Sequence, residues 1–480
     1  MNKENSFVRL FTILVIALLG SIVLYWLPDS IGGYKLKKVD LLADVRIKPV
    51  PLSLDSLMKQ LEETDTIPEH EMIPDSLVVD HSLDSVMLAL RDSLYRTIYT
   101  VAGADSSGAH LEDYSTGHVG LARFFSALES RETLDRPVRI AFLGDSFIEG
   151  DIIVADLRTA LQKEFGGNGV GFVPVFSITD QYRPTINQKV EGWDAYSILK
   201  DTARTYMFSG TLFEPEEKAS LSIKPADKYP ELSHAASFKF YYTGKKPGVI
   251  SYVTDAQPDT ITKRLIPQEE PGFLEIEEPF EEAFFRFSEG EDMLAFGTAM
   301  EDNDGVVVDN FSLRGNSGLI LDRLNLDLCR GFSEIRPYDL IVLQYGLNVV
   351  SEEVLNYGWY RTRMIGVVRH IQQCFPDTDI LLMGVSDRAY QSDDSFETMP
   401  AVLALLHAQR QIAKSTGITF WNTFGAMGGV NSMTRFVENN WASKDYTHLS
   451  FRGGREIAKA FYEALMLEKE FYDKADETIH

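Results

Sequence analysis

The segment around residue 140 constrains the fold more than any other part of the chain. An apolar run over 139–143 predicts a short buried strand, and it leads directly into Gly144, Asp145 and Ser146. Asp151 can then cap a helix whose apolar residues recur at helical spacing. A serine in the turn between strand and helix predicts an open α/β sheet. Such a sheet would present the hydroxyl at its carboxyl edge, where ligands of these folds bind.

Three later segments direct polar groups to the same edge. Apolar runs over 306–313 and 338–344 predict two more strands, and these lead to Gly315 and Asn348. Near the end of the chain, the segment 445–448 carries an aspartate and a histidine, three positions apart, ahead of an amphipathic helix. Because the carboxyl ends of parallel strands meet at one edge of a sheet, we expect these groups to lie together.

These residue types suit nucleophilic catalysis. The hydroxyl of Ser146 needs a base, which His448 can supply, and the histidine needs a partner such as Asp445 to hold its tautomer. A tetrahedral oxyanion needs donors, for which the sequence offers the N–H groups of Ser146 and Gly315 and the side-chain amide of Asn348. Taken singly, Asn348 is more simply a turn residue and His448 a surface or capping histidine. Their order along the chain, each at a strand end, favours the catalytic interpretation.

The order Gly-Asp-Ser, Gly, Gly-x-Asn and Asp-x-x-His resembles the four sequence blocks of the SGNH (GDSL) hydrolase superfamily. The segments 144–151, 157–162, 165–172 and 420–429, together with Trp441, are similar to the bacterial peptidoglycan O-acetylesterase branch of that superfamily.

What the resemblance implies is a flavodoxin-like three-layer α/β/α esterase domain, split into 115–181 and 306–475. In this family Ser, Gly and Asn build the oxyanion hole and Asp-x-x-His completes the triad, without a cofactor. We therefore expect Asp145 and Asp151 to be structural. One departure from the family pattern is Val349, since many relatives carry Asp after the oxyanion asparagine.

The segment 182–305 interrupts this domain. It consists of short β-like runs separated by Pro, Gly and Asp turns, which predicts an inserted antiparallel β-sandwich. In the esterases that the chain resembles, a carbohydrate-binding-module-like domain occupies this place. Several aromatic residues of the insertion can stack on sugar rings, although packing in the core is the favoured interpretation for each of them: Trp193, Tyr196, Tyr206, Tyr241 and Tyr242.

The N-terminus predicts attachment to a membrane. Residues 10–27 form an uncharged run of 18 residues, about 27 Å as a helix, with an aromatic pair at its far end. We interpret it as a retained signal anchor, with cleavage as a signal peptide the alternative. Residues 1–9 are then cytoplasmic, and 28–114 form an acidic linker, whether as a charged spacer or as a stretch that provides length alone.

Composition excludes several functions. The 480 residues contain 46 Lys and Arg against 71 Asp and Glu, so the net charge of −25 argues against a nucleic-acid partner. No His, Asp or Glu cluster has the spacing of metal ligands, so neither metal nor cofactor is predicted. The two cysteines, Cys329 and Cys374, fall on predicted helices and are either free buried thiols or one disulfide.

The sequence thus predicts a serine esterase of the bacterial cell envelope, anchored in the inner membrane with its catalytic domain outside the cytoplasm. O-acetylated polysaccharide, with peptidoglycan the leading candidate, is the expected substrate. An O-acetyltransferase that uses the same triad, fed by a membrane acetyl-transfer partner, is the first alternative. A non-catalytic glycan-binding protein is the second.

Overall fold

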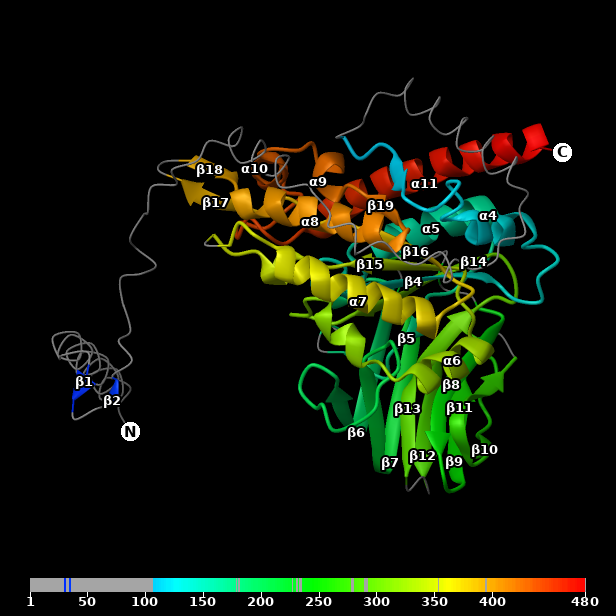
Figure 1. Ribbon diagram of the computed structural model, residues 1–480. Helices are drawn as coiled ribbons and strands as arrows, with labels where there is room; N and C mark the ends of the chain where they lie inside the picture. Colours follow the sequence, from blue (N-terminus) through cyan, green and yellow to red (C-terminus); the bar gives the residue numbers. More distant parts are fainter. Residues whose placement is uncertain are drawn as a thin grey trace. The chain divides into compact units, whose positions relative to one another are not determined.

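The computed structural model describes residues 30–31, 34–35 and 107–479, except 178, 180–181, 227, 230–231, 233–234, 278–279, 289–291, 353 and 393–394 (Figure 1). The chain forms two compact units, one of residues 1–56 with 391–395 and one of 57–390 with 396–480. In the first unit, β1 (Ser30–Ile31) and β2 (Tyr34–Lys35) pair in antiparallel fashion.

The predicted anchor over 10–27 and the cytoplasmic segment 1–9 lie outside the described residues, as does most of the linker. Within the described part of the chain, no helix combines the length and the apolar character needed to cross a membrane.

The larger unit is built on a six-stranded sheet in the order β14-β4-β15-β16-β19-β3. Five strands are parallel, and the short edge strand β3 is antiparallel to β19. Numbered along the chain, the parallel strands follow the order 2-1-3-4-5 of flavodoxin-like sheets. Every residue of β4 and β15 is buried, as expected for parallel strands covered on both faces. The bounds are β3 Leu111–Asp113, β4 Val138–Gly144, β14 Val306–Ser312, β15 Leu340–Gln344, β16 Asp379–Met383 and β19 Thr419–Trp421.

Helices cover both faces of this sheet. Helix α7 packs against α6 and α8, while α5 packs against α11, which also contacts α4 (Figure 1). The bounds of the long helices are α4 Ala122–Glu129, α5 Val154–Phe165, α6 Leu326–Ile335, α7 Gly358–Cys374, α8 Pro400–Thr416 and α11 Phe451–Ile479. The short helical segments are η3 Glu149–Asp151, η6 Leu319–Arg323, η7 Leu347–Val349, α9 Thr423–Ala426 and α10 Ser432–Glu438. A separate hairpin joins β17 (Ala389–Ser392) to β18 (Ser395–Thr398).

The remaining strands form an antiparallel β-sandwich, drawn in green in Figure 1. Its strand order is β10-β9-β12-β7-β13-β8-β11, with β6 beside β7 and β5 beside β13. Buried and exposed residues alternate strictly along β12, so one face of this strand points into an apolar core. The bounds are β5 Gly171–Val173, β6 Ile186–Ser197, β7 Thr211–Pro225, β8 Ser237–Gly244, β9 Gly248–Thr254, β10 Ile261–Leu265, β11 Gln268–Ile276, β12 Ala283–Ser288 and β13 Met293–Glu301.

The prediction of a mixed α/β protein with a parallel sheet and an antiparallel sandwich is confirmed, and two short strands correct its details. Leu111–Asp113, which the sequence analysis assigned to the linker, is the edge strand of the parallel sheet. Gly171–Val173, assigned to the esterase domain, pairs with β13 of the sandwich. A strand of three residues has too few alternating positions to be recognised from its sequence.

The aromatic residues proposed for sugar stacking are mostly core residues. Trp193, Tyr206, Tyr241 and Tyr242 are all buried, which agrees with the favoured interpretation of packing. Tyr196 differs, because its ring is half-buried beneath the guanidinium of Arg204, 3.6 Å from the ring centroid.

A buried charge network joins the sandwich to the parallel sheet. Glu301 at the end of β13 contacts Arg139 of β4 and Arg336 after α6, each at 2.7 Å. Arg336 also contacts Asp309 of β14 at 2.8 Å, and all four side chains are at least 96% buried. Burial alone would raise the pKa of Glu301, but the two guanidinium groups hold the pKa well below its usual range. The carboxylate therefore stays charged between two cations.

We expect Glu301→Gln to lower the free energy of unfolding by about 3–5 kcal/mol at pH 7, because it leaves two buried guanidinium groups without their shared carboxylate. Since the folded-state pKa is depressed, the stabilisation is present above the unfolded pKa near 4.3 and is lost as the pH falls towards the folded value. Urea unfolding across this pH range measures both effects. Glu463→Gln, which removes the exposed pair with Lys459, is the control and should change stability by less than about 1 kcal/mol. Equal losses at both positions would contradict the network's role.

Candidate active site

Ser146 lies in the tight turn that follows β4. Asp145 shapes this turn, because its carboxylate accepts the backbone N–H of Phe147 at 2.9 Å and its carbonyl accepts that of Ile148 at 3.4 Å. Position 144 requires glycine because its neighbours lie too close for a side chain. A Cβ there would meet the Ile148 side chain at 2.7 Å and the Gln344 carbonyl at 3.0 Å. The turn therefore leaves the sheet between the ends of two neighbouring strands.

The acid–base residues come from the loop between α10 and α11. Asp445 accepts the backbone N–H groups of Thr447 and His448 on Oδ1, both at 3.0 Å, and its Oδ2 lies 2.8 Å from Nδ1 of His448. Burial opposes ionisation of Asp445, but the hydrogen bonds from His448 and Thr447 lower its pKa. An ionised Asp445 holds the proton on Nδ1, which leaves Nε2 as the acceptor.

The structure places the three predicted residues in hydrogen-bonding contact one after another, from Ser146 to His448 to Asp445. Nε2 of His448 lies 3.3 Å from Oγ of Ser146, across 302 positions of the chain. The side chains of His448 and Asp445 are 42% and 51% exposed, so the acid–base pair faces solvent. This geometry allows His448 to take the proton of the Ser146 hydroxyl.

Gly315 and Asn348 also reach this edge of the sheet, but in different ways. Gly315 has a φ of +79° and open space where a Cβ would be, so its backbone lies free at the surface of its loop. The amide of Asn348 donates to Oδ2 of Asp145 at 2.9 Å and to the carbonyl of Asn316 at 3.0 Å. Both N–H groups of that amide are thus already engaged, which the sequence did not indicate.

Two further carboxylates hold the nucleophile segment, and sequence reasoning missed how they do so. Glu149, which is buried, forms an ion pair with Arg314 and so links the Ser146 turn to the Gly315 loop. Asp151 does not cap α5, because that helix starts at Val154 with no side-chain cap. Instead its buried carboxylate binds side chains from three segments: Arg158, Arg183, Thr185 and Asn310. The expectation that Asp145 and Asp151 are structural agrees with these contacts.

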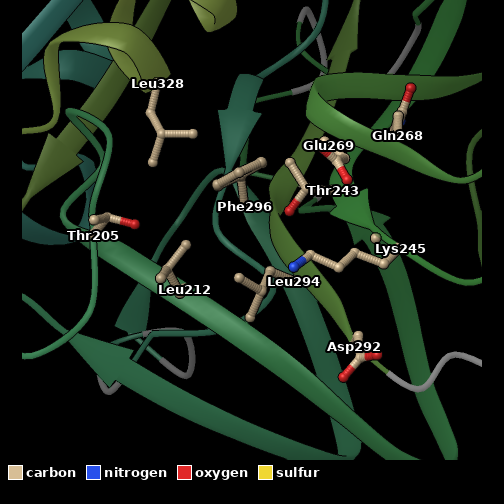
Figure 2. A pocket seen from close by; sticks show the side chains of 11 residues that line it. Thr205, Leu212, Thr243, Lys245, Gln268, Glu269, Asp292, Leu294, Phe296 and Leu328 are labelled. Atoms are coloured by element: carbon tan, nitrogen blue, oxygen red, sulfur yellow. The ribbon is translucent and has the colours of Figure 1, made fainter.

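A cavity of about 320 Å³ lies on the sandwich (Figure 2). Leu212, Leu294 and Phe296 line it together with the polar side chains of Lys245 and Asp292. None of its lining residues is one of the predicted site residues, so this cavity is separate from the serine–histidine pair.

Other candidate centres are few. Among the described residues, no group of three or more His, Cys, Asp and Glu is arranged to hold a metal ion. Cys329 on α6 and Cys374 on α7 are buried free thiols. Outside the acid–base loop, Nε2 of His370 lies 2.8 Å from the carbonyl of Leu324.

Neither a family model nor a curated protein matches the sequence. Among solved structures, a peptidoglycan O-acetylesterase is similar with a TM-score of 0.62 and 19% identity, over 75% of this chain and 99% of that chain. A family two carbohydrate esterase from Cellvibrio japonicus has a TM-score of 0.25 and 9% identity, over 60% and 99%. A family 29 carbohydrate-binding module has a TM-score of 0.18 and 10% identity, over 27% and 90%.

The first of these similarities agrees with the fold that the motif resemblance implied. At 19% identity the similarity shows the fold alone: the chain shares the fold of that peptidoglycan O-acetylesterase. The other two TM-scores are too low to support an argument.

The titration of Asp145 supplies a test of the site's electrostatics. Burial raises the pKa of Asp145 to about 6, although Phe147 and Asn348 donate hydrogen bonds to it. Because the unfolded carboxyl titrates near 3.8, the folded state binds the proton more tightly, and stability falls as the pH rises from about 4 through 6. Asp145→Asn cannot titrate, so its stability relative to wild type should improve by roughly 2–3 kcal/mol between pH 4 and pH 7.5. Thermal or urea unfolding measures this difference, with the exposed Asp135→Asn as control. Parallel curves for wild type and Asp145→Asn would contradict the shift.

Proposed function

We propose that this protein is a serine esterase that removes O-acetyl groups from cell-envelope polysaccharide, with O-acetylated peptidoglycan as the leading substrate. Two distances carry the proposal. Ser146 Oγ lies 3.3 Å from His448 Nε2, and His448 Nδ1 lies 2.8 Å from Asp445 Oδ2. The similarity of the fold to that of a peptidoglycan O-acetylesterase supports the proposal.

The reaction proceeds through an acetyl-enzyme. Ser146 Oγ attacks the acetyl carbonyl while His448 Nε2 takes the hydroxyl proton, and Asp445 stabilises the imidazolium that forms. His448 then gives this proton to the departing sugar oxygen, which leaves acetyl-Ser146. Water attacks the new ester with His448 again as base, and acetate departs.

The developing oxyanion is stabilised by backbone N–H groups of Ser146 and Gly315 and by the amide of Asn348. In this proposal one N–H of Asn348 exchanges the Asn316 carbonyl for the oxyanion, since its other N–H stays on Asp145. The ionised Asp145 then fixes the plane of the amide during the exchange.

The other segments anchor the enzyme in the cell envelope and orient its substrate. The apolar run over 10–27 anchors the protein in the inner membrane, and the catalytic unit works on the extracytoplasmic side. The sandwich orients the glycan. Its binding surface does not involve the aromatic side chains that are buried in its core.

An O-acetyltransferase is the alternative that the same geometry accommodates. The exposed side chains of His448 and Asp445 leave room for either water or an acceptor sugar hydroxyl to approach the acetyl-enzyme. With an acetyl-exporting membrane partner, the same triad would transfer the group. A purely glycan-binding role does not require a serine, histidine and aspartate within hydrogen-bonding distance of one another.

We expect the full-length protein to release acetate from O-acetylated peptidoglycan. Ser146→Ala should lower kcat by about 10³-fold or more, because the nucleophile is lost, and Asp445→Asn should also cause a large loss. Acetate is measured with and without an acceptor glycan. Ser126→Ala, at an exposed position of α4 outside the sandwich, is the matched control and should retain wild-type kcat.

Three outcomes decide between the functions. Absence of acetate from wild type, or equal release by Ser146→Ala, refutes the esterase. Acetyl esters that appear on the acceptor in place of free acetate identify a transferase.

A further inference from the structure

The loop that carries the acid–base pair is closed on itself and exposed. Ser443 donates its backbone N–H to the carbonyl of His448 at 2.8 Å and its hydroxyl to Asp445 Oδ1 at 3.1 Å. These bonds set the shape of the loop but do not fix where it stands relative to Ser146. With His448 and Asp445 about half exposed, packing by their own side chains gives little help.

Tyr446 provides an external contact for this loop. Its φ of +54° lies in the left-handed region, which is costly for a residue with a large side chain. This backbone turns the ring out of the loop and onto Phe396, and the two rings are parallel within 6° with centroids 3.7 Å apart. The carbonyl of Tyr446 also accepts the N–H of Ala389 at 3.1 Å.

Phe396 lies in β18 and is held through hydrogen bonds of its own backbone and of Thr398. Its carbonyl accepts the hydroxyl of Thr434 on α10 at 3.2 Å. Thr398, two positions on, exchanges two hydrogen bonds with Asn431, at 2.9 Å and 2.7 Å. The residue before the hairpin, Arg388, donates to the carbonyl of Val350, two positions after Asn348. The neighbouring residues Arg388 and Ala389 thus connect the segment after Asn348 to the acid–base loop.

We propose that Phe396 is a positioning residue for the acid–base pair. By stacking on Tyr446 it holds the strained loop, and with it His448 Nε2, within reach of Ser146 Oγ. Phe396 does not contact the reacting atoms, and it acts through Tyr446. This inference rests on the proposed esterase function, because it assigns a role within the same triad.

Substitutions at position 396 test the proposal in the full-length protein. We expect Phe396→Ala and Phe396→Leu to lower kcat for acetate release about tenfold with KM within twofold, since a displacement of about 1 Å can cost up to 10²-fold. Phe396→Tyr keeps the stacked ring and should restore kcat. The unfolding midpoint of all three should stay near wild type because both rings are only partly buried. Leu467→Ala, at a 38% exposed apolar residue of α11 outside the sandwich, is the control and should leave kcat unchanged.

A second readout separates this inference from the choice of substrate. Covalent labelling of Ser146 by a fluorophosphonate reports the serine–histidine geometry without any glycan. We expect the labelling rate to fall with kcat in Phe396→Ala and Phe396→Leu, and to recover in Phe396→Tyr. If wild type labels but releases no acetate, the proposed substrate fails, while the labelling rates of the variants still decide the role of Phe396.

Several results would overturn the positioning role. One is a wild-type labelling rate for Phe396→Leu. Another is a higher KM at unchanged kcat, which would make Phe396 a substrate contact. A third is a fall in the unfolding midpoint that parallels the loss of activity and is not rescued by Phe396→Tyr.

Discussion

The register of three parallel strands is the constraint on which the rest of the site depends. Gly144 at the end of β4 pairs with Ser312 of β14 on one side and with Gln344 of β15 on the other. The three strands therefore end at the same level, and their loops carry Ser146, Gly315 and Asn348 to one edge. A shift of any strand along its neighbour would separate these groups by more than 3 Å for each residue of slip.

Buried carboxylates keep these loops in place once the strands have set their origins. Asp145 joins the nucleophile turn to Asn348, and Glu149 joins it to the loop of Gly315. Asp151 binds Arg183, which lies just before the first long strand of the sandwich. The same device operates at the other end of β14 and β4, where Glu301 and Arg336 bind the sandwich to the sheet. Charges buried in this way are costly unless paired, so each network favours a single arrangement of its loops.

The acid–base loop is not held by buried charges. It faces solvent, and its own hydrogen bonds leave its distance from Ser146 to be set by neighbours. The stack of Phe396 on Tyr446 and the hydrogen bond from Ala389 to the Tyr446 carbonyl hold the loop from outside the sheet. In the proposed esterase, a rigid nucleophile and an open acid–base pair together leave a path for a polymeric substrate.

The sequence by itself determined the α/β class, the sandwich and the residues that approach Ser146, because strand periodicity, turn residues and motif order are local properties of the chain. It mistook Asp151 for a helix cap and missed the edge strand Leu111–Asp113, since both depend on partners far away in the sequence. Only the tertiary structure decided that Asn348 donates to Asp145, across 203 positions, and that Phe396 lies on Tyr446. Such contacts arise from how loops pack after the sheet has formed, and no local pattern encodes that packing.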